Sequence, residues 1–303
     1  MKSPKLLALA ASAALITSAS ASVTIDWVTV GNPGNAADTT TYGAVSYAYQ
    51  IGKYEVTNAQ YGAFLNAAAK TDSYALYNSS MSSYGITQSG SPGNYTYSVT
   101  GTLANRPVVW VSWFDGARFA NWMVNGQGSG STEIGAYNLN GAISGIITKD
   151  AEAQVYIPTE DEWYKAAYYK AATSTYSLYP DGQNSITPEA NNAYNTFRAG
   201  ILSGGGLVDV GSYSSSPSSY GTFDQGGNVW EWNDAVSGSS RGGRGGFSVR
   251  QPDGLLPSSR RQDVPPSIET GDLGFRLASA VPEPSSLVLT MLASGVVLLR
   301  RKR

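Results

Sequence analysis

The side chains that could carry out chemistry in this chain are carboxylates, because its 303 residues include no cysteine and no histidine. A chain without thiols has no thiolate nucleophile, no disulfide and no zinc–thiolate cluster. A chain without imidazoles has no Ser-His-Asp triad, no imidazole proton shuttle and no histidine metal ligand. Three classes of function remain: carboxylate chemistry, binding of hard cations through oxygen ligands, and binding without catalysis.

The most compact acidic group is Glu160-Asp161-Glu162. Two carboxylates about 5 to 9 Å apart in a cleft would suit glycoside hydrolysis. These three instead fall in the first turn of a predicted helix, where they stabilise the helix dipole, and no other acidic pair stands out. Five arginines could bind an anion or a sugar acid, but structural ion pairs with the many carboxylates are the role that we expect for them: Arg241, Arg244, Arg260, Arg261 and Arg276.

Three capping boxes predict where helices begin. They start at Thr57, Ser112 and Thr159, and each precedes an apolar stripe at helical spacing. Short strands are predicted over residues 25–30, 45–53 and 108–111, and ordered surface loops or disorder over 71–101, 126–145 and 212–220. Six tryptophans are expected to fill the core: Trp110, Trp113, Trp122, Trp163, Trp230 and Trp232.

The first 21 residues have the pattern of a secretory signal peptide. Two lysines precede an apolar stretch, and Ala19-Ser20-Ala21 follows it. This order predicts export and a cut after Ala21.

Residues 281–303 contain Pro282-Glu283-Pro284, an apolar run over 287–299 and four terminal basic residues. The run is shorter than the roughly 20 residues that cross a bilayer comfortably. The tail resembles the PEP-CTERM sorting signal. The resemblance implies a Gram-negative bacterium, recognition by an exosortase and only transient contact with the membrane.

Removing both ends changes the charge of the chain. When residues 22–284 remain, the signal has taken two and the removed part of the tail four of the 20 Lys and Arg residues, which leaves 14 against 22 Asp and Glu and a net charge of −8. An acidic, charge-poor surface argues against nucleic acid and anionic membranes as partners. It suits a protein that binds cations or neutral polymers.

Several motifs, in this order, resemble the formylglycine-generating enzyme (sulfatase-modifying factor) family. They are Gly52-Lys53-Tyr54-Glu55-Val56-Thr57-Asn58, Arg106-Pro107-Val108-Val109-Trp110-Val111-Ser112-Trp113, Ile157-Pro158-Thr159-Glu160-Asp161-Glu162-Trp163, Gly226-Gly227-Asn228-Val229-Trp230-Glu231-Trp232, Arg244-Gly245-Gly246 and Gly274-Phe275-Arg276. The resemblance covers Tyr49 to Ala278. It implies an α+β fold related to C-type lectins, with little regular secondary structure and long loops, in a domain over residues 22–280.

The resemblance also bears on catalysis. In the family, two cysteines that oxidise a sulfatase cysteine follow the Gly-Gly motif. Here that stretch is Phe247 to Leu256, with Arg250 and Leu255 near the expected positions. A second branch, the ergothioneine-type iron oxidases, needs histidine ligands. Because the chain has neither residue type, neither kind of family catalysis is available to it.

A calcium site is implied by the resemblance at Asp224, Gly227, Val229 and Glu231. Hard cations bind carboxylate and carbonyl oxygens in a loop that can fold around them, and Gly226-Gly227 provides that freedom. In the alternative interpretation, Asn228 and Glu231 cap the turn while the neighbouring tryptophans fill the core.

The function that we expect is a secreted, exosortase-sorted protein of the cell surface or extracellular matrix. Its domain would be non-catalytic, would bind polysaccharide or protein through its loops and would hold structural calcium. Tyr74–Tyr97 and Tyr176–Tyr194 have the composition of recognition loops, which solvated low-complexity loops share. The alternatives are a carboxylate-dependent hydrolase or lyase acting on extracellular glycans, and a passive matrix component without a specific ligand.

Overall fold

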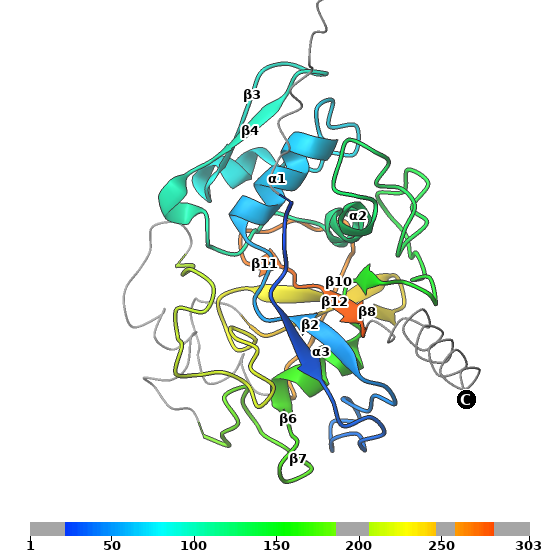
Figure 1. Ribbon diagram of the computed structural model, residues 1–303, viewed down its shortest axis with the longest axis vertical. Helices are drawn as coiled ribbons and strands as arrows, with labels where there is room; N and C mark the ends of the chain where they lie inside the picture. The colour runs from blue at the N-terminus through cyan, green and yellow to red at the C-terminus, as the bar shows by residue number, and fades with distance from the viewer. Residues whose placement is uncertain (1–21, 186–205, 247–257, 282–303) are drawn as a thin grey trace, which may run out of the picture.

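The computed structural model describes residues 22–185, 206–246 and 258–281. The predicted signal peptide and sorting tail therefore lie outside the described residues. In Figure 1, α1 (Asn58–Ala68) and α2 (Trp113–Val124) lie above the central strands, and α3 (Glu160–Tyr168) lies below them.

All three helices begin at the predicted caps. Thr57, Ser112 and Thr159 each accept a hydrogen bond from the backbone N–H three residues later, and the side chain at that later position binds back to the cap. Both halves of the capping box are thus formed in every case, which satisfies backbone donors that have no partner within the helix.

Two four-stranded sheets form the centre of the domain. The first is antiparallel, in the order β1 (Trp27–Val30), β2 (Tyr49–Gly52), β12 (Ala278–Ala280) and β5 (Val155–Tyr156). The second has the order β10 (Gln262–Val264), β9 (Ser240–Arg244), β8 (Trp230–Ser237) and β11 (Leu273–Gly274). In this sheet β11 runs parallel to β8, and the other neighbours are antiparallel.

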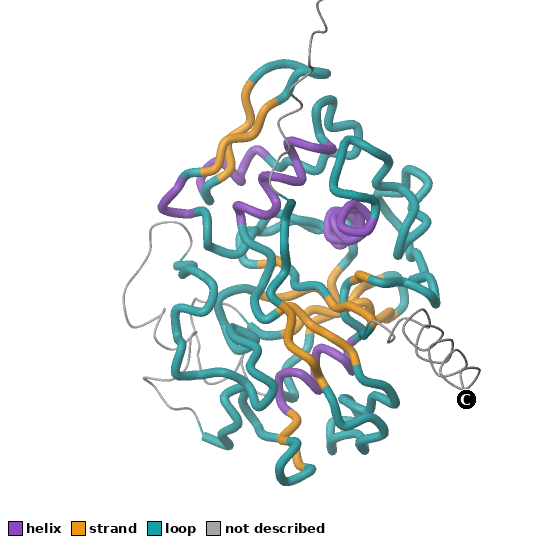
Figure 2. Tube along the Cα trace, viewed as in Figure 1, coloured by secondary structure: helices purple, strands orange, loops and turns teal. Residues whose placement is uncertain are grey.

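Two short hairpins and two 3₁₀ turns lie outside the two four-stranded sheets. One hairpin joins β3 (Ile86–Ser89) to β4 (Thr96–Val99), and another joins β6 (Tyr169–Lys170) to β7 (Thr175–Tyr176). Two 3₁₀ turns, η1 (Ser79–Ser83) and η2 (Gly101–Leu103), flank the first hairpin. Loops make up most of the remaining path, as Figure 2 shows.

The structure corrects one predicted strand and refines one loop. Residues 108–111 form no strand, because Trp110 has a left-handed backbone (φ 61°) that interrupts the extended conformation a strand needs. The stretch 71–101 is ordered and contains η1 and the first hairpin, and η2 begins at its last residue. The stretches 126–145 and 212–220 form neither helix nor strand.

The core is aromatic where the helices meet. Phe119 of α2 packs edge-on against Phe64 of α1, and against Phe275 beside β11, with ring centroids 5.4 and 5.6 Å apart. Five of the six tryptophans are buried as predicted, and Trp110 is partly buried. The α+β fold with long loops and little regular secondary structure is confirmed.

Candidate functional site

Three of the four residues predicted to bind calcium lie in one tight turn that leads into β8, and the fourth, Glu231, is the second residue of that strand. Asp224, Gly227 and Asn228 all have left-handed backbones, with φ values of 63°, 111° and 58°. Three such residues within five positions turn the chain sharply, and Gly227 donates its N–H to the Gly245 carbonyl at 2.8 Å. Asp224 accepts a hydrogen bond from the Gly211 N–H at 2.6 Å.

Glu231 is held by an arginine and a tryptophan. Arg276 donates from Nε to Oε2 and from Nη2 to Oε1, both at 2.6 Å, and the Trp163 indole N–H donates to Oε2 at 2.7 Å. Glu231 and Arg276 are both fully buried. A two-point guanidinium–carboxylate pair of this kind satisfies both oxygens and fixes the geometry.

Glu55, which the sequence interpretation did not single out, lies beside this pair. Its Oε1 accepts a hydrogen bond from the Asn228 amide at 3.1 Å, while Oε2 has no hydrogen-bond partner and lies 3.9 Å from Arg276 Nη2. Burial raises the pKa of Glu55 well above its ordinary value, and the nearby Asp224 and Glu231 raise it further against the opposing effect of Arg276. The signal that could have pointed to Glu55 is its place in the first family-like motif.

These contacts decide how well the four residues suit calcium. The turn can offer carbonyl oxygens from Gly227 and Val229 and a carboxylate from Asp224. Glu231, however, would have to share its oxygens with Arg276. Within the described part of the chain, no three acidic side chains gather closely enough to hold one metal ion. The fit is partial, and calcium at these positions stays a prediction.

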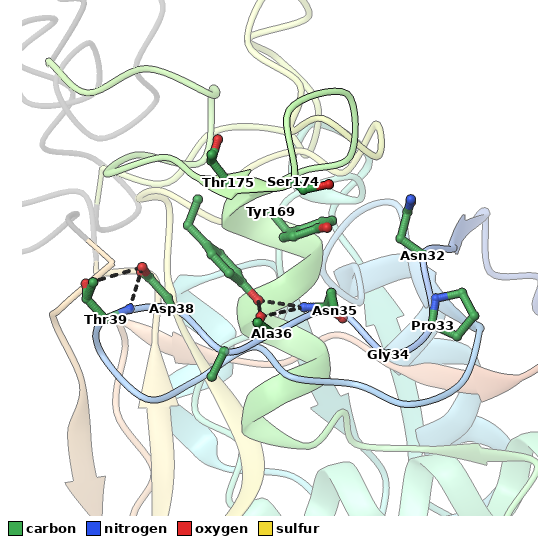
Figure 3. Close-up of a pocket in the computed structure, with 12 residues that line it drawn as sticks. Asn32, Pro33, Gly34, Asn35, Ala36, Asp38, Thr39, Tyr169, Ser174 and Thr175 are labelled. Atoms are coloured by element: carbon green, nitrogen blue, oxygen red, sulfur yellow. Dashed lines mark hydrogen bonds between the residues drawn. The ribbon is translucent and has the colours of Figure 1, made fainter.

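A separate pocket of 670 Å³ lies on the other side of α3, between the Asn32–Thr39 loop and the β6–β7 hairpin. Figure 3 shows Asn32 to Thr39 along one wall and Tyr169, Ser174 and Thr175 along the other. The walls come from segments more than 130 residues apart in the sequence. They meet because the loop follows β1 of the first sheet and the hairpin follows α3, which packs on β2.

Asn35 and Tyr176 join the two walls. The Asn35 amide donates to the Tyr176 hydroxyl and to the Gly43 carbonyl, both at 2.7 Å. Gly43 has a φ of 92°, and a Cβ there would lie 2.7 Å from the same hydroxyl, so only glycine fits. Burial is the main cause that raises the pKa of Tyr176, and its hydroxyl therefore stays neutral.

The polar groups of the pocket are almost all neutral. Asp38 is the one carboxylate among the described residues that line it, and it accepts hydrogen bonds from the Thr39 N–H at 2.7 Å and the Tyr164 hydroxyl at 2.5 Å. The rings of Tyr169 and Tyr176 pack edge-on, with centroids 5.0 Å apart. Amides, hydroxyls and backbone carbonyls beside aromatic rings can bind a neutral polyhydroxyl ligand.

The acidic and basic side chains of the other family-like motifs have structural partners. Glu160 pairs with Arg244 at 2.6 Å and with Arg261 at 2.7 Å. Asp161 accepts from the Gly43 N–H, and Glu162 accepts from the Thr159 N–H and the Tyr156 hydroxyl. The place of this acidic triplet in the first turn of α3 is confirmed, and so are structural ion pairs for Arg241, Arg244, Arg261 and Arg276.

The carboxylate pair required by the alternative enzymatic function is not formed in the pockets described. Among the described residues that line each pocket, Asp38 is the only acidic one in the pocket of Figure 3, and Asp272 is the only acidic one in a pocket of 220 Å³ beside β8. A third, of 570 Å³, contains no acidic residue among its described lining.

A comparison with protein-family models decides the family. Residues 27–281 match the model described as "Sulfatase-modifying factor enzyme 1-like domain". The chain belongs to the sulfatase-modifying factor family. This membership confirms the family resemblance of the motifs, and it does not test the PEP-CTERM tail.

Solved structures of similar fold agree with this membership. CarF is 22% identical, with a TM-score of 0.55 over 86% of this chain and 99% of its own. Treponema denticola variable protein 1 is 21% identical, with a TM-score of 0.50 over 86% of this chain and 97% of its own. At these identities the likeness establishes the fold alone. A search of curated proteins gives no significant match.

The position of the sulfatase-modifying factor cysteines, Phe247 to Leu256, lies outside the described residues. Gly245 and Gly246, which lead into it, have left-handed backbones with φ of 98° and 75°. Thiol and imidazole chemistry are excluded by composition alone, because no cysteine or histidine occurs anywhere in the chain. Among the described helices, none combines the length and the apolar character that a membrane crossing requires.

Proposed function

We propose that this protein is exported, sorted by an exosortase to the cell surface or extracellular matrix, and binds neutral extracellular polysaccharide without catalysing a reaction on it. The observation that carries the proposal is the pocket between the Asn32–Thr39 loop and the β6–β7 hairpin. It is open to a polymer, lined by neutral hydrogen-bonding groups and flanked by tyrosine rings, and among the described residues that line it only Asp38 is acidic.

The non-catalytic part of the proposal follows from composition and from the ion pairs. Thiol and imidazole chemistry are unavailable to the whole chain. The buried charges of the family motifs are engaged with one another, as Glu231 is with Arg276 and Glu160 with Arg244. These pairs stabilise a binding scaffold.

Structural calcium belongs to the same proposal, at Asp224, Gly227, Val229 and Glu231. Its support is the acidic turn before β8, with Glu55 beside it as an additional buried carboxylate. Positive charge at this place would offset the excess of carboxylates over the single guanidinium of Arg276.

Binding is tested by titrating the exported protein with neutral and with uronic-acid oligosaccharides. Asn35→Ala removes the amide that joins the two walls, and we expect a loss of affinity for neutral oligosaccharide of about tenfold or more. Asp38→Asn removes the charge and keeps the shape, so we expect affinity to change by less than about threefold. Asn94→Ala, at an exposed turn of the β3–β4 hairpin, serves as the control.

Three results would contradict the proposal. Equal binding by wild type and Asn35→Ala would show that the pocket is not the site. Cleavage of an oligosaccharide that Asp38→Asn abolishes would favour the glycan-degrading enzyme, and binding of matrix protein in place of oligosaccharide would favour the protein-binding alternative.

Export and sorting are tested in cells. Mass spectrometry of the mature protein locates both chain ends, and the proposal requires a start at residue 22 and a cut near Pro282-Glu283-Pro284. Deletion of residues 285–303 should stop surface localisation, and unchanged localisation would contradict the sorting step.

A further inference from the structure

Among the residues that line the pocket of Figure 3, Asn32 has hydrogen-bond donors to offer to a ligand. It begins the Asn32–Thr39 loop, its side chain is exposed, and its amide nitrogen lies at the tip of the side chain, away from the loop (Figure 3). This nitrogen donates to no described residue. The Asn35 amide, by contrast, already donates to the Gly43 carbonyl and the Tyr176 hydroxyl.

Two side chains from other segments hold the oxygens of Asn32. Lys165 of α3 donates from Nζ to the backbone carbonyl of Asn32 at 2.8 Å, and the Tyr220 hydroxyl donates to Asn32 Oδ1 at 3.1 Å. Burial is the main cause that raises the pKa of Tyr220 to about 12, so its hydroxyl keeps its proton at neutral pH. Because both oxygens have a partner, the groups that Asn32 offers to the pocket are its two amide N–H donors.

The position of Asn32 is maintained at a cost to the fold. Its φ is 55°, in the left-handed region that a residue with a Cβ adopts unfavourably. Lys165 is fully buried and forms no ion pair with any described acidic residue, and burial lowers its pKa to about 8. An unpaired buried cation is unfavourable as well. Costs of this kind are typical of places where a side chain must be held in one orientation.

A donor-only group favours a ligand atom that only accepts. A carbonyl oxygen accepts through two lone pairs and carries no hydrogen, whereas a sugar hydroxyl must first turn its own hydrogen away. Among neutral sugars, an N-acetylated amino sugar provides such a carbonyl in its acetamido group. A carboxylate also accepts, but its charge is repelled by Asp38, which lines the same pocket.

We propose that Asn32 determines the specificity of this pocket by donating to the acetamido carbonyl of an N-acetylated neutral sugar. The inference rests on the proposed function, which places neutral polysaccharide in the pocket, and it names the class of sugar. Asn32 touches the ligand, while Lys165 and Tyr220 act through it as positioning residues.

The experiment compares two oligosaccharides with the same linkage and the same glucose backbone, chitotetraose and cellotetraose. Chitotetraose has an acetamido group where cellotetraose has a hydroxyl. Calorimetric titration of the processed protein at neutral pH gives both affinities, and we expect chitotetraose to bind about five- to tenfold more tightly.

Asn32→Asp keeps the shape of the side chain and removes its N–H donors, and Asn32→Gly removes the side chain and suits the left-handed backbone. We expect both variants to lose the preference, so that the ratio of the two affinities falls to about one. Lys165→Met keeps the Asn32 amide and frees its carbonyl, and it should reduce the preference by about threefold with little change for cellotetraose.

Asn140 provides a matched control. It is also an exposed asparagine with a left-handed backbone, with a φ of 45°, and it does not line the pocket. Asn140→Asp and Asn140→Gly should leave both affinities unchanged, and thermal unfolding of every variant shows that it is folded.

The possible results separate this inference from the proposed function. Equal affinity of the wild type for the two oligosaccharides would overturn the inference, and so would a preference that survives in both Asn32 variants while Asn35→Ala still weakens binding. Tighter binding of an oligogalacturonate than of chitotetraose would also overturn it. No binding of any oligosaccharide would contradict the proposed function itself.

Discussion

At the scale of single residues, the buried charged side chains of the family motifs are held by ion pairs and hydrogen bonds. Glu231 and Arg276 are both fully buried and share two hydrogen bonds. Removing one member of such a pair leaves the other charged, buried and unpaired, which costs more than the pair contributes. Glu55 adds a second acidic group beside this pair, and its Oε2 has no hydrogen-bond partner.

The first prediction concerns this pair. Glu231→Gln should lower the free energy of unfolding by about 3–5 kcal/mol, because the Arg276 guanidinium loses its charged partner. Urea unfolding measures the loss. The double variant Glu231→Gln/Arg276→Met should recover part of it, and a double variant as unstable as the sum of both single variants would show that the two residues are not coupled.

The second prediction concerns Glu55 and pH. Its folded pKa lies well above that of the unfolded chain, so the unfolded state loses the proton first as the pH rises above about 4.5. Stability attributable to this group therefore falls with rising pH, by up to about 1.4 kcal/mol per pH unit, until the folded group ionises as well.

Glu55→Gln removes this proton equilibrium. We expect unfolding free energies measured from pH 4 to 8 to depend less steeply on pH, with higher stability than wild type at pH 8. The exposed Glu152→Gln is the matched control. A variant with the same slope as wild type would rule out Glu55 as the source of the dependence.

At the scale of elements, residues close together in the sequence determine where a helix begins, whereas strand formation depends on distant partners as well. Each capping box closes within four residues, so the chain itself contains the whole signal. The stretch 108–111 has strand-like side chains, yet Trp110 takes a left-handed backbone and donates its N–H to the Thr270 carbonyl at 2.9 Å. That partner is 160 residues away and overrides the local preference.

The third prediction tests a cap. Thr57→Ala removes the hydroxyl that accepts from the Gln60 N–H, and it should lower stability by about 1 kcal/mol. Thr57→Ser keeps the oxygen and should stay within a few tenths of a kcal/mol of wild type. Thermal or urea unfolding of the two variants gives the comparison, and equal losses would show that side-chain packing, and not the cap, is responsible.

At the scale of the whole molecule, one fold brings together the turn before β8, the first family-like motif and the Gly-Phe-Arg segment near its end. The same fold forms the polar pocket from the Asn32–Thr39 loop and the β6–β7 hairpin. Binding at either place would stabilise the entire domain, because a ligand that binds only the folded state raises its stability.

The fourth prediction is the calcium dependence of this stability. The Tm of the processed protein should rise with free calcium and fall in excess chelator, by an amount that grows with the free concentration. Asp224→Asn should reduce the shift. A Tm that calcium does not change would show that Arg276 provides the positive charge at this turn and that calcium is not bound there.

The sequence by itself determined the helix starts, the chemistry excluded by the lack of cysteine and histidine, and the family to which the motifs belong. These depend on contacts within one turn of helix, on composition and on ordered motifs. It also identified the acidic turn before β8, although whether calcium binds there stays a prediction.

Only the tertiary structure decided which side chains bind one another. Arg276 reaches Glu231 across 45 residues, Asn228 reaches Glu55 across 173, and Asn35 reaches Tyr176 across 141. Residue spacing does not specify such pairs, because they form only once the sheets have closed and α3 has packed on them. The two walls of the pocket that supports the proposed function are joined by contacts of this long-range kind.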